Sequence, residues 1–206
     1  MWKTILDLLF PIQCLGCNQE GNFLCYSCFK KLSFNTKQAK NNLLIASYYK
    51  DPLIKLLIHQ YKYNFIKDLA KPLGMLMVKK IKNQNIKNSI LIPVPLHKKR
   101  LRWRGFNQAE LLAQVISQKL NIPIINNLLV RTRYTPPQAK IKNANQRKEN
   151  IKQAFQLNLN FKNNLENKKI ILIDDICTTG STLDECTEVL KVLEPKSIWG
   201  LVIAKE

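Results

Sequence analysis

The chain has 206 residues, 46% of them hydrophobic, which suits one medium-sized domain, alone or with a small appendage, and excludes wholesale disorder. Its 33 Lys and Arg residues against 14 Asp and Glu residues give a net charge of +19, which favours phosphate-rich ligands, nucleic acid or acidic lipid headgroups as partners. Biased coding is the alternative source of that charge, since the chain is rich in Lys, Asn and Ile.

The N-terminal segment MWKTILDLLFPIQC is a poor signal peptide, because Asp7 interrupts it and it lacks a small-residue cleavage site. The spacing of its apolar residues predicts a short amphipathic helix that packs on its own domain, with membrane or partner docking as the alternative. These residues are Trp2, Ile5, Leu6, Leu9 and Phe10. No apolar run reaches the ~18 residues that a membrane span needs, so we expect no transmembrane segment and a cytoplasmic location.

Residues 1–34 hold four of the six cysteines, arranged as two Cys-x-x-Cys pairs separated by seven residues. Four thiolates with this spacing suit a tetrahedral Zn²⁺ in a closed structural site, which would help a module with little core of its own to fold. The candidate ligands are Cys14, Cys17, Cys25 and Cys28. Two redox dithiols, an iron–sulfur cluster or unpaired cysteines are the alternatives.

Residues 35–206 alternate between strand and helix patterns and form the second predicted domain. A short strand at 43–49 precedes helices at 51–61 and 66–82, where apolar residues recur at i, i+3 and i+4. Further along, the patterns predict strands at 89–94, 122–130, 155–159, 169–173 and 196–204, and helices at 107–120 and 181–193. Because the best strands are apolar on both faces, we predict an α/β fold with a mostly parallel sheet covered by helices.

Residues 131–153 form a polar, basic and proline-containing stretch that is long for a connection inside a compact domain. It is therefore either disordered or a functional lid. The candidate lid residues are Arg131, Arg133, Gln138 and Arg147, and a closed lid would exclude water from a site. A disordered basic loop attracted to nucleic acid is the alternative.

The strongest signal is residues 170–182, IILIDDICTTGST, in which an apolar strand leads into two acids, small hydroxyl residues, a glycine and a helix. The amides of Thr178, Thr179, Gly180, Ser181 and Thr182 can point at one phosphate. Gly180 permits close approach, and Ser181 or Thr182 is expected to cap a helix whose positive end favours an anion. A strand–turn–helix junction without a ligand is the alternative, and a nucleotide P-loop is excluded because its Gly-Lys-Ser/Thr ending is missing.

Asp174 and Asp175 would repel a phosphate, so we expect them to bind the hydroxyl groups of an adjoining sugar, directly or with Mg²⁺. Two acids that bind the neighbouring hydroxyl groups of a sugar, next to a loop that binds phosphate, indicate a ribose 5-phosphate site. The stretch closely resembles the phosphoribosyl-pyrophosphate signature of type I phosphoribosyltransferases. That resemblance implies that both acids contact the ribose hydroxyls and that residues 178–182 hold the 5′-phosphate. Either acid is also a candidate catalytic base, since no dedicated base is evident.

Five basic residues crowd the exit of the strand predicted at 89–94, namely Lys98, Lys99, Arg100, Arg102 and Arg104. In the type I fold this strand end carries the pyrophosphate-binding loop, and arginine forks match the charges of a pyrophosphate. A solvated basic face is the alternative. Trp103 lies among these residues, and we interpret it as a core residue, with stacking on a base as the alternative.

Five motifs, in this order and over nearly the whole chain, resemble the ComF (ComFC) family of competence-associated, amidophosphoribosyltransferase-like proteins. They are the Cys-x-x-Cys start, PVPLHKKR with RGFNQ, RTRYTPPQ, Arg147-x-x-Asn150 and the Asp-Asp loop. The family implies a cytoplasmic bacterial protein with a zinc module, linked to natural transformation and working on incoming single-stranded DNA with the competence machinery.

Two functions fit these observations. The first is an enzyme that binds Mg²⁺–phosphoribosyl pyrophosphate and displaces pyrophosphate from C1 with a nitrogen nucleophile, through positioning and charge stabilisation. No nucleobase pocket is evident from the sequence. The second is a single-stranded DNA-binding competence factor that keeps the fold without turnover, using its arginines for phosphates and Trp103 for stacking.

Overall fold

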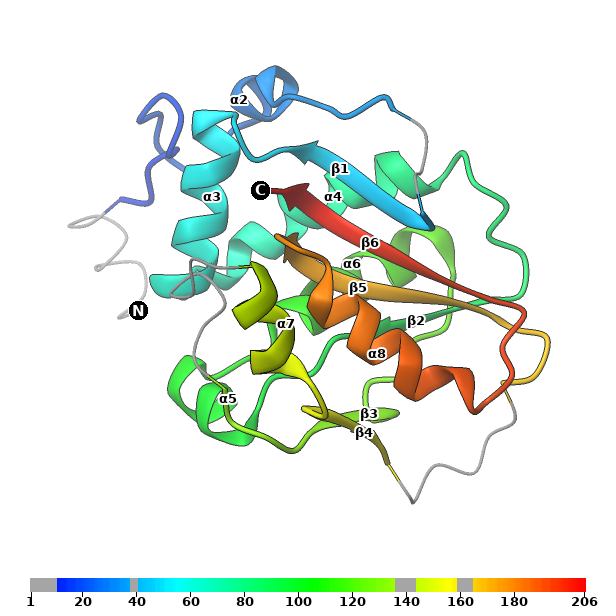
Figure 1. Cartoon of the computed structure of the whole chain (residues 1–206). Helices are drawn as coiled ribbons and strands as arrows, with labels where there is room; N and C mark the ends of the chain where they lie inside the picture. Colours follow the sequence, from blue (N-terminus) through cyan, green and yellow to red (C-terminus); the bar gives the residue numbers. More distant parts are fainter. Residues whose placement is uncertain (1–10, 38–40, 136–143, 159–164) are drawn as a thin grey trace, which may run out of the picture.

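The computed structural model describes residues 11–37, 41–135, 144–158 and 165–206, so the amphipathic helix predicted at residues 1–10 lies outside it. A four-stranded, wholly parallel sheet with the order β1-β6-β5-β2 forms the centre of the molecule (Figure 1). Its strands are β1 (Leu43–Tyr48), β2 (Ser89–Pro93), β5 (Lys169–Cys177) and β6 (Ser197–Lys205). Because all four run in one direction, their carboxyl ends meet at one edge. The predicted α/β fold with a mostly parallel sheet is confirmed.

Helices cover both faces of this sheet (Figure 1). Ile171 and Ile173 of β5 belong to the core formed with α3 (Pro52–Tyr63), α4 (Ala70–Ile81) and α6 (Gln108–Leu120). Ile170 and Leu172 alternate with them in sequence and pack with α8 (Ser181–Lys191) on the opposite face. Successive side chains of a strand point to opposite faces, so a strand covered on both sides is apolar throughout.

The strand β5 is longer than predicted, and its extra length includes the two acids. It continues past residue 173 because residues 174–177 pair with residues 202–205 of β6. The parallel ladder therefore holds the backbone of Asp174 and Asp175, which do not lie in a free loop. The helix predicted at 66–82 consists of η1 (Lys67–Leu69) followed by α4.

A small antiparallel sheet of β3 (Leu129–Arg131) and β4 (Phe155–Leu157) packs beside α8. The strand predicted at 122–130 is therefore mostly wrong. Pro123 has no N–H to donate, and residues 126–127 turn the chain, so only Ile124 forms an isolated bridge to Leu91 before β3 begins. The strand predicted at 155–159 ends two residues early, at Leu157.

Within the described part of residues 35–206, two short helices were not predicted, α5 (Lys98–Arg104) and α7 (Ala144–Ile151). The side chain of His97 caps α5 by accepting the N–H of Lys99 at 3.2 Å, and Gly105 ends it at φ +78°. No residue of α5 is buried, so the helix has no apolar stripe from which periodicity could be recognised. Part of the stretch predicted as a lid is the helix α7, which packs against α8.

The N-terminal module contains α2 (Tyr26–Lys31) and packs on the larger domain. Leu15, Phe23 and Phe29 contact the core that includes α3. The N–H of Ser33 donates to Oδ2 of Asp51, the residue that caps α3, at 2.9 Å. A domain boundary at residue 34 remains a prediction. Within the described ranges, no helix has both the length and the apolar character that crossing a membrane requires.

Candidate functional site

A cavity of about 710 Å³ opens at the carboxyl edge of the sheet. It lies between the last turn of α3, the segment after β2, α5, the end of β5 and the start of α8. Open α/β sheets bind ligands at this edge, because the loops that follow the strands meet there. The predicted site residues that line it are Lys99, Arg100, Arg104, Arg131, Asp174, Asp175, Thr178, Gly180, Ser181 and Thr182.

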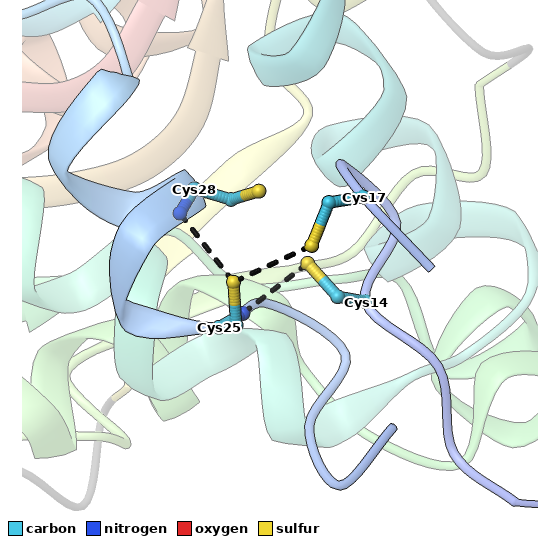
Figure 2. A group of neighbouring side chains, drawn as sticks. All are labelled: Cys14, Cys17, Cys25 and Cys28. Carbon is cyan, nitrogen blue, oxygen red and sulfur yellow. Dashed lines mark hydrogen bonds between the residues drawn. The ribbon is translucent and has the colours of Figure 1, made fainter. Parts of the chain in front are cut away.

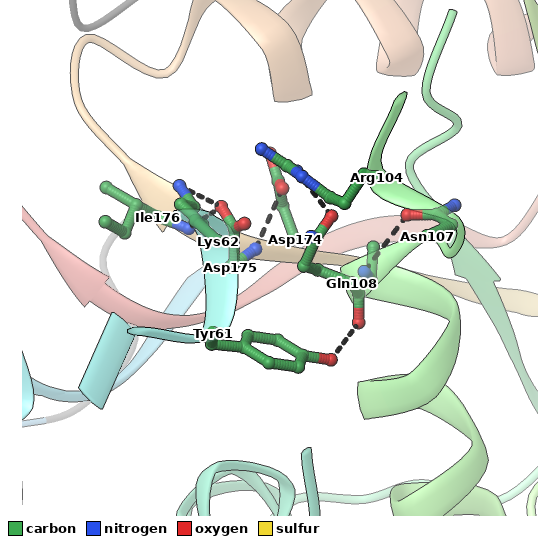
Figure 3. Close-up of polar contacts among 9 residues, drawn as sticks. Tyr61, Lys62, Arg104, Asn107, Gln108, Asp174, Asp175 and Ile176 are labelled. Carbon is green, nitrogen blue, oxygen red and sulfur yellow. Dashed lines mark hydrogen bonds and ion pairs between the residues drawn. The ribbon is translucent and has the colours of Figure 1, made fainter. Parts of the chain in front are cut away.

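Backbone amides and a lysine hold the two acids at the end of β5 (Figure 3). Oδ1 of Asp174 accepts the N–H of Asp175 at 2.8 Å, and Oδ1 of Asp175 accepts the N–H of Ile176 at 2.6 Å. Asp175 also forms an ion pair with Lys62 of α3, with 2.7 Å between Oδ1 and Nζ. Burial, together with the nearby charge of Asp175, raises the pKa of Asp174 to about 7. Asp174 therefore exchanges a proton close to neutral pH.

The loop between β5 and α8 brings the start of a helix to the cavity. The predicted cap at Ser181 or Thr182 is wrong: the N-cap is Gly180, at φ +91°, which has no side chain to accept a hydrogen bond. The hydroxyl of Thr179 accepts the N–H of Ser181 at 3.4 Å and is paired with the hydroxyl of Ser181, with 2.8 Å between their Oγ atoms. Thr179 is exposed and is not part of the cavity lining. The first amides of a helix have no partner within the helix and are suited to bind an anion.

The basic cluster divides between two sides of α5. Lys99, Arg100 and Arg104 line the cavity, whereas Lys98 and Arg102 are exposed and do not line it. Arg100 and Arg104 share one face because they are four residues apart, and Lys98 and Arg102 share another face for the same reason. Three of the five residues therefore share the cavity, and their contact with pyrophosphate or nucleic acid remains a prediction.

The interpretation of Trp103 as a core residue is wrong. This residue is 61% exposed and lines the cavity. Its ring meets that of Phe65 edge-on, with 4.9 Å between the ring centroids. Tyr134, which is 53% exposed, also lines the cavity and packs edge-on against His97. The cavity therefore has an aromatic rim as well as a basic wall.

Arg104 reaches into the cavity from the last turn of α5 and is largely buried. Its Nη1 donates to Oε1 of Gln108 at 2.5 Å, and burial lowers the pKa of its guanidinium. The Nε of Arg104 and the Nε2 of Gln108 are buried without a hydrogen-bond partner in the described part of the chain. A buried donor without a partner costs about 1–3 kcal/mol, so a ligand with acceptor atoms would recover free energy here.

The four predicted lid residues have different environments. Arg131 is buried in β3 and lines the cavity, its Nη2 donates to Oγ1 of Thr135 at 2.5 Å, and burial lowers its pKa to about 10. Arg133 donates to carbonyls at the end of α7, including that of Asn150 at 3.1 Å, and does not line the cavity. Gln138 lies outside the described residues, and so does the side chain of Arg147, whose backbone belongs to α7.

The four N-terminal cysteines converge on one point (Figure 2). All four Sγ atoms lie within 4.8 Å of one another, and those of Cys17 and Cys25 are 3.6 Å apart. Thiolates bound at about 2.3 Å to a tetrahedral Zn²⁺ lie roughly 3.8 Å apart, so the donor set fits this ion. The predicted convergence of Cys14, Cys17, Cys25 and Cys28 is confirmed, and the cluster can hold a metal such as zinc.

The backbone around Cys14 supports a negatively charged sulfur at this residue. The amides of Gly16 and Cys25 donate to Sγ of Cys14 at 3.4 and 3.3 Å. Burial acts to raise the pKa of Cys14, but these amide donors outweigh it and lower the pKa to about 6. A Cβ at Gly16 would lie 2.8 Å from Sγ of Cys28, so only glycine fits there without displacing a ligand.

Comparisons with known proteins agree with this arrangement. Residues 107–205 match the phosphoribosyl transferase domain. Competence protein F of Haemophilus influenzae is 31% identical over 209 residues, an alignment that covers 93% of this chain and 90% of that protein. This chain belongs to the ComF family of competence proteins. The DNA utilization protein YhgH of Escherichia coli (strain K12) is 33% identical, over 68% of this chain and 61% of its own length. Competence protein ComFC of Bacillus subtilis is 35% identical, over 47% of this chain and 36% of its own length.

Several cavity residues of this ComF chain were not predicted as site residues. His59, Lys62 and Tyr63 line the cavity from one side of the α3 end, and Tyr49 follows β1. The i, i+3, i+4 spacing of the α3 residues predicts a shared face, but no sequence signal indicates that this face meets the acids of β5. Lys62 is one of 33 Lys and Arg residues, and charge alone does not distinguish it from the others.

Proposed function

We propose that this ComF chain binds Mg²⁺–phosphoribosyl pyrophosphate in the cavity at the carboxyl edge of the sheet. One observation carries the proposal: a single cavity is lined by two adjacent aspartates, by a helix start whose N-cap is a glycine, and by five Lys and Arg residues. These three chemistries match, in turn, the ribose hydroxyls, the 5′-phosphate and the pyrophosphate. The match to the phosphoribosyl transferase domain supports the same assignment.

Each part of the ligand would meet a different element of the chain. Asp174 and Asp175 would accept hydrogen bonds from the ribose hydroxyl groups. The amides of residues 178–182 would hold the 5′-phosphate, aided by the positive end of α8. The cations Lys99, Arg100, Arg104 and Arg131 would bind the pyrophosphate. The remaining predicted contact residues, Lys98 and Arg102, do not line the cavity, and we assign to them a contact with nucleic acid below.

Two metals belong to the proposal. Mg²⁺, bound with the substrate, would neutralise part of the pyrophosphate charge. Zn²⁺ held by the four cysteines would have a structural role, because all four coordination positions would be filled.

The reaction that fits this site is transfer of the phosphoribosyl group. The bond between C1 and the pyrophosphate oxygen would break, pyrophosphate would leave with the electron pair, and a nitrogen nucleophile would form the new bond to C1. The cations around the cavity would stabilise the leaving charge. Asp174 is the candidate acceptor of the nucleophile's proton, because its pKa lies at about 7.

Isothermal titration calorimetry with Mg²⁺–phosphoribosyl pyrophosphate tests the binding site. Replacing Asp174→Asn together with Asp175→Asn removes two charged acceptors at similar volume, and should weaken binding by roughly 100-fold. Glu188→Gln is the matched control, because it removes a carboxylate from the exposed side of α8 and should leave affinity unchanged. Equal affinity in the double variant and the wild type would contradict the assignment. Release of pyrophosphate across a panel of amines and bases tests turnover.

A second candidate function, binding of single-stranded nucleic acid, is favoured by the surface of α5. Trp103 and Tyr134 are both more than half exposed, and Lys98 and Arg102 extend the basic surface away from the cavity. Exposed aromatic rings stack on bases while neighbouring cations bind phosphates. The names of the relatives, competence protein and DNA utilization protein, agree with a role in DNA uptake.

Fluorescence anisotropy with a labelled single strand tests this second function. Stacking on one aromatic ring contributes roughly 1–3 kcal/mol, so Trp103→Ala should weaken binding at least about fivefold. Tyr26→Ala is the control, because Tyr26 is 71% exposed but lies in the N-terminal module, away from the cavity. If both variants bind like the wild type, Trp103 is not a stacking residue.

A further inference from the structure

Lys62 enters the cavity from the last turn of α3, and the fold determines its direction (Figure 3). The preceding residue, Tyr61, is fully buried, and its hydroxyl donates to the carbonyl of Gln108 at 2.9 Å. This bond joins the end of α3 to the start of α6. A cation is also favourable at the carboxyl end of a helix, where the backbone carbonyls concentrate negative charge.

The ion pair between Lys62 and Asp175 is largely shielded from water. The Lys62 side chain is 19% exposed and that of Asp175 is 11% exposed, so solvent screens the pair weakly. Oδ1 of Asp175 receives both the ammonium of Lys62 and the N–H of Ile176. Two donors on one oxygen hold the carboxylate in a single orientation. In the described part of the chain, its other oxygen has no protein donor and stays available to a hydroxyl group.

Asp174 differs from its neighbour although the two are adjacent in β5. It accepts one backbone N–H, and within the described ranges no Lys or Arg lies at ion-pair distance from it. The charged and titratable groups around it are Tyr49, His59, Lys62 and Tyr63 from the β1–α3 side, Lys99, Arg100 and Arg104 of α5, Arg131 of β3, Asp175 and Cys177 of β5, Cys186 of α8, Tyr134 and Glu206. Among these, Asp175 and burial raise the pKa of Asp174, whereas Lys62 and Arg131 lower it.

We propose that Lys62 is a positioning residue of the sugar-phosphate site: it holds Asp175 as a fixed acceptor for one ribose hydroxyl and favours the charged form of Asp174 as acceptor for the other. This role rests on the proposed function of the cavity. Two neighbouring carboxylates without a cation tend to share a proton, because their charges repel each other. An ammonium at 2.7 Å from Asp175 offsets this repulsion and so allows both acids to act as acceptors at neutral pH.

The first test measures Asp174 in the ligand-free, zinc-loaded full chain. Carbon-13 NMR of labelled aspartate carboxyl groups follows the titration of Asp174, which is assigned by its loss in Asp174→Asn. Lys62→Met should move the midpoint upward by about one pH unit, because the lowering charge is removed. Lys62→Arg should restore the midpoint, and Lys98→Met, which removes an exposed lysine outside the cavity, should leave it unchanged. An unchanged midpoint in Lys62→Met would overturn the proposal.

The second test measures binding of Mg²⁺–phosphoribosyl pyrophosphate by calorimetry between pH 6 and pH 8. Lys62→Met should bind about tenfold more weakly at pH 7, and the difference should narrow at pH 8 as Asp174 ionises. A purely structural lysine would weaken binding equally at every pH, and that result would also overturn the proposal. Thermal unfolding of each variant verifies that it is folded. If the wild type gives no binding heat while the NMR midpoint shifts as expected, the proposed ligand fails and the electrostatic coupling stands.

Discussion

Asp174 and Arg131 are two cavity residues whose acid–base properties are set by burial. Taking a carboxyl or guanidinium group out of water disfavours its charged form, which raises the pKa of Asp174 to about 7 and lowers that of Arg131 to about 10. Burial of these two groups lowers the free energy of unfolding, since each would be better solvated in the unfolded chain. Such residues are typical of ligand sites rather than of structural cores.

The raised pKa of Asp174 predicts how stability depends on pH. In the folded chain Asp174 binds its proton more tightly than in the unfolded chain, where its pKa is about 3.9. Its contribution to stability is therefore complete below about pH 4 and is lost as the pH rises through about 7. The difference in free energy of unfolding between Asp174→Asn and the wild type should thus grow in favour of the variant by roughly 1–2 kcal/mol from about pH 5.5 to pH 8. Urea unfolding at several pH values measures this difference, and a gain that is the same at every pH would contradict it.

Substitution of Gly180 separates the effect of backbone strain from the effect on ligand binding. The φ of this glycine is +91°, and the atom nearest to an added Cβ is Oδ2 of Asp184 at 3.6 Å, so Gly180→Ala meets strain and no clash. The expected loss of stability is roughly 1–2 kcal/mol. Because the loop shape is disturbed, binding of the sugar phosphate should weaken as well. Gly105→Ala is the matched control, since Gly105 has φ +78° with open space around it and does not line the cavity. Its stability should fall similarly while its affinity stays unchanged.

At the scale of elements, the N-terminal module shows how the cysteine cluster and the hydrophobic core support each other. The cysteine cluster packs against Leu24 and Leu53, and Leu53 belongs to α3. The opposite end of α3 carries Lys62 into the cavity. The same helix therefore contacts the cysteine cluster at its start and the candidate ligand site at its end.

Removing the metal tests the contribution of this module. We expect one zinc ion per chain in the wild type and in Cys186→Ala, and close to none in Cys25→Ser, as measured by plasma emission spectrometry. Chelation should cost at least about 2 kcal/mol, which lowers the thermal midpoint by roughly 4–8 °C for a chain of this size. Cys186 is buried in α8, so its alanine variant controls for the loss of a cysteine without the loss of a ligand. A wild-type chain without zinc and without a response to chelator would contradict the metal site.

At the scale of the whole molecule, the charge of +19 surrounds a cavity that is itself cationic. Five Lys and Arg residues line the cavity against three carboxylates. The exposed residues Lys98 and Arg102 continue this basic surface along α5. A surface of one sign attracts polyanions from a distance and binds them more weakly as salt is added.

Binding of a single strand should therefore depend steeply on salt. If five phosphates are neutralised, the slope of log K against log salt should be about −3.5. Anisotropy titrations at several salt concentrations measure the slope. The double variant Lys98→Gln with Arg102→Gln should reduce it by roughly 1.4 units, since each lost contact removes about 0.7. A slope near zero for the wild type would rule out the nucleic-acid function.

The amino-acid sequence by itself determined the fold class, the cysteine cluster and the acid–loop–helix segment, because each is encoded by local spacing or periodicity. Apolar runs such as that of β5 identify strands covered on both faces, and two Cys-x-x-Cys pairs suffice to bring four ligands together. Only the tertiary structure decided that Lys62 pairs with Asp175, that Trp103 is exposed and that Arg133 supports α7. These outcomes depend on which surfaces of distant segments meet, and contacts between segments far apart in sequence leave no local pattern in the chain.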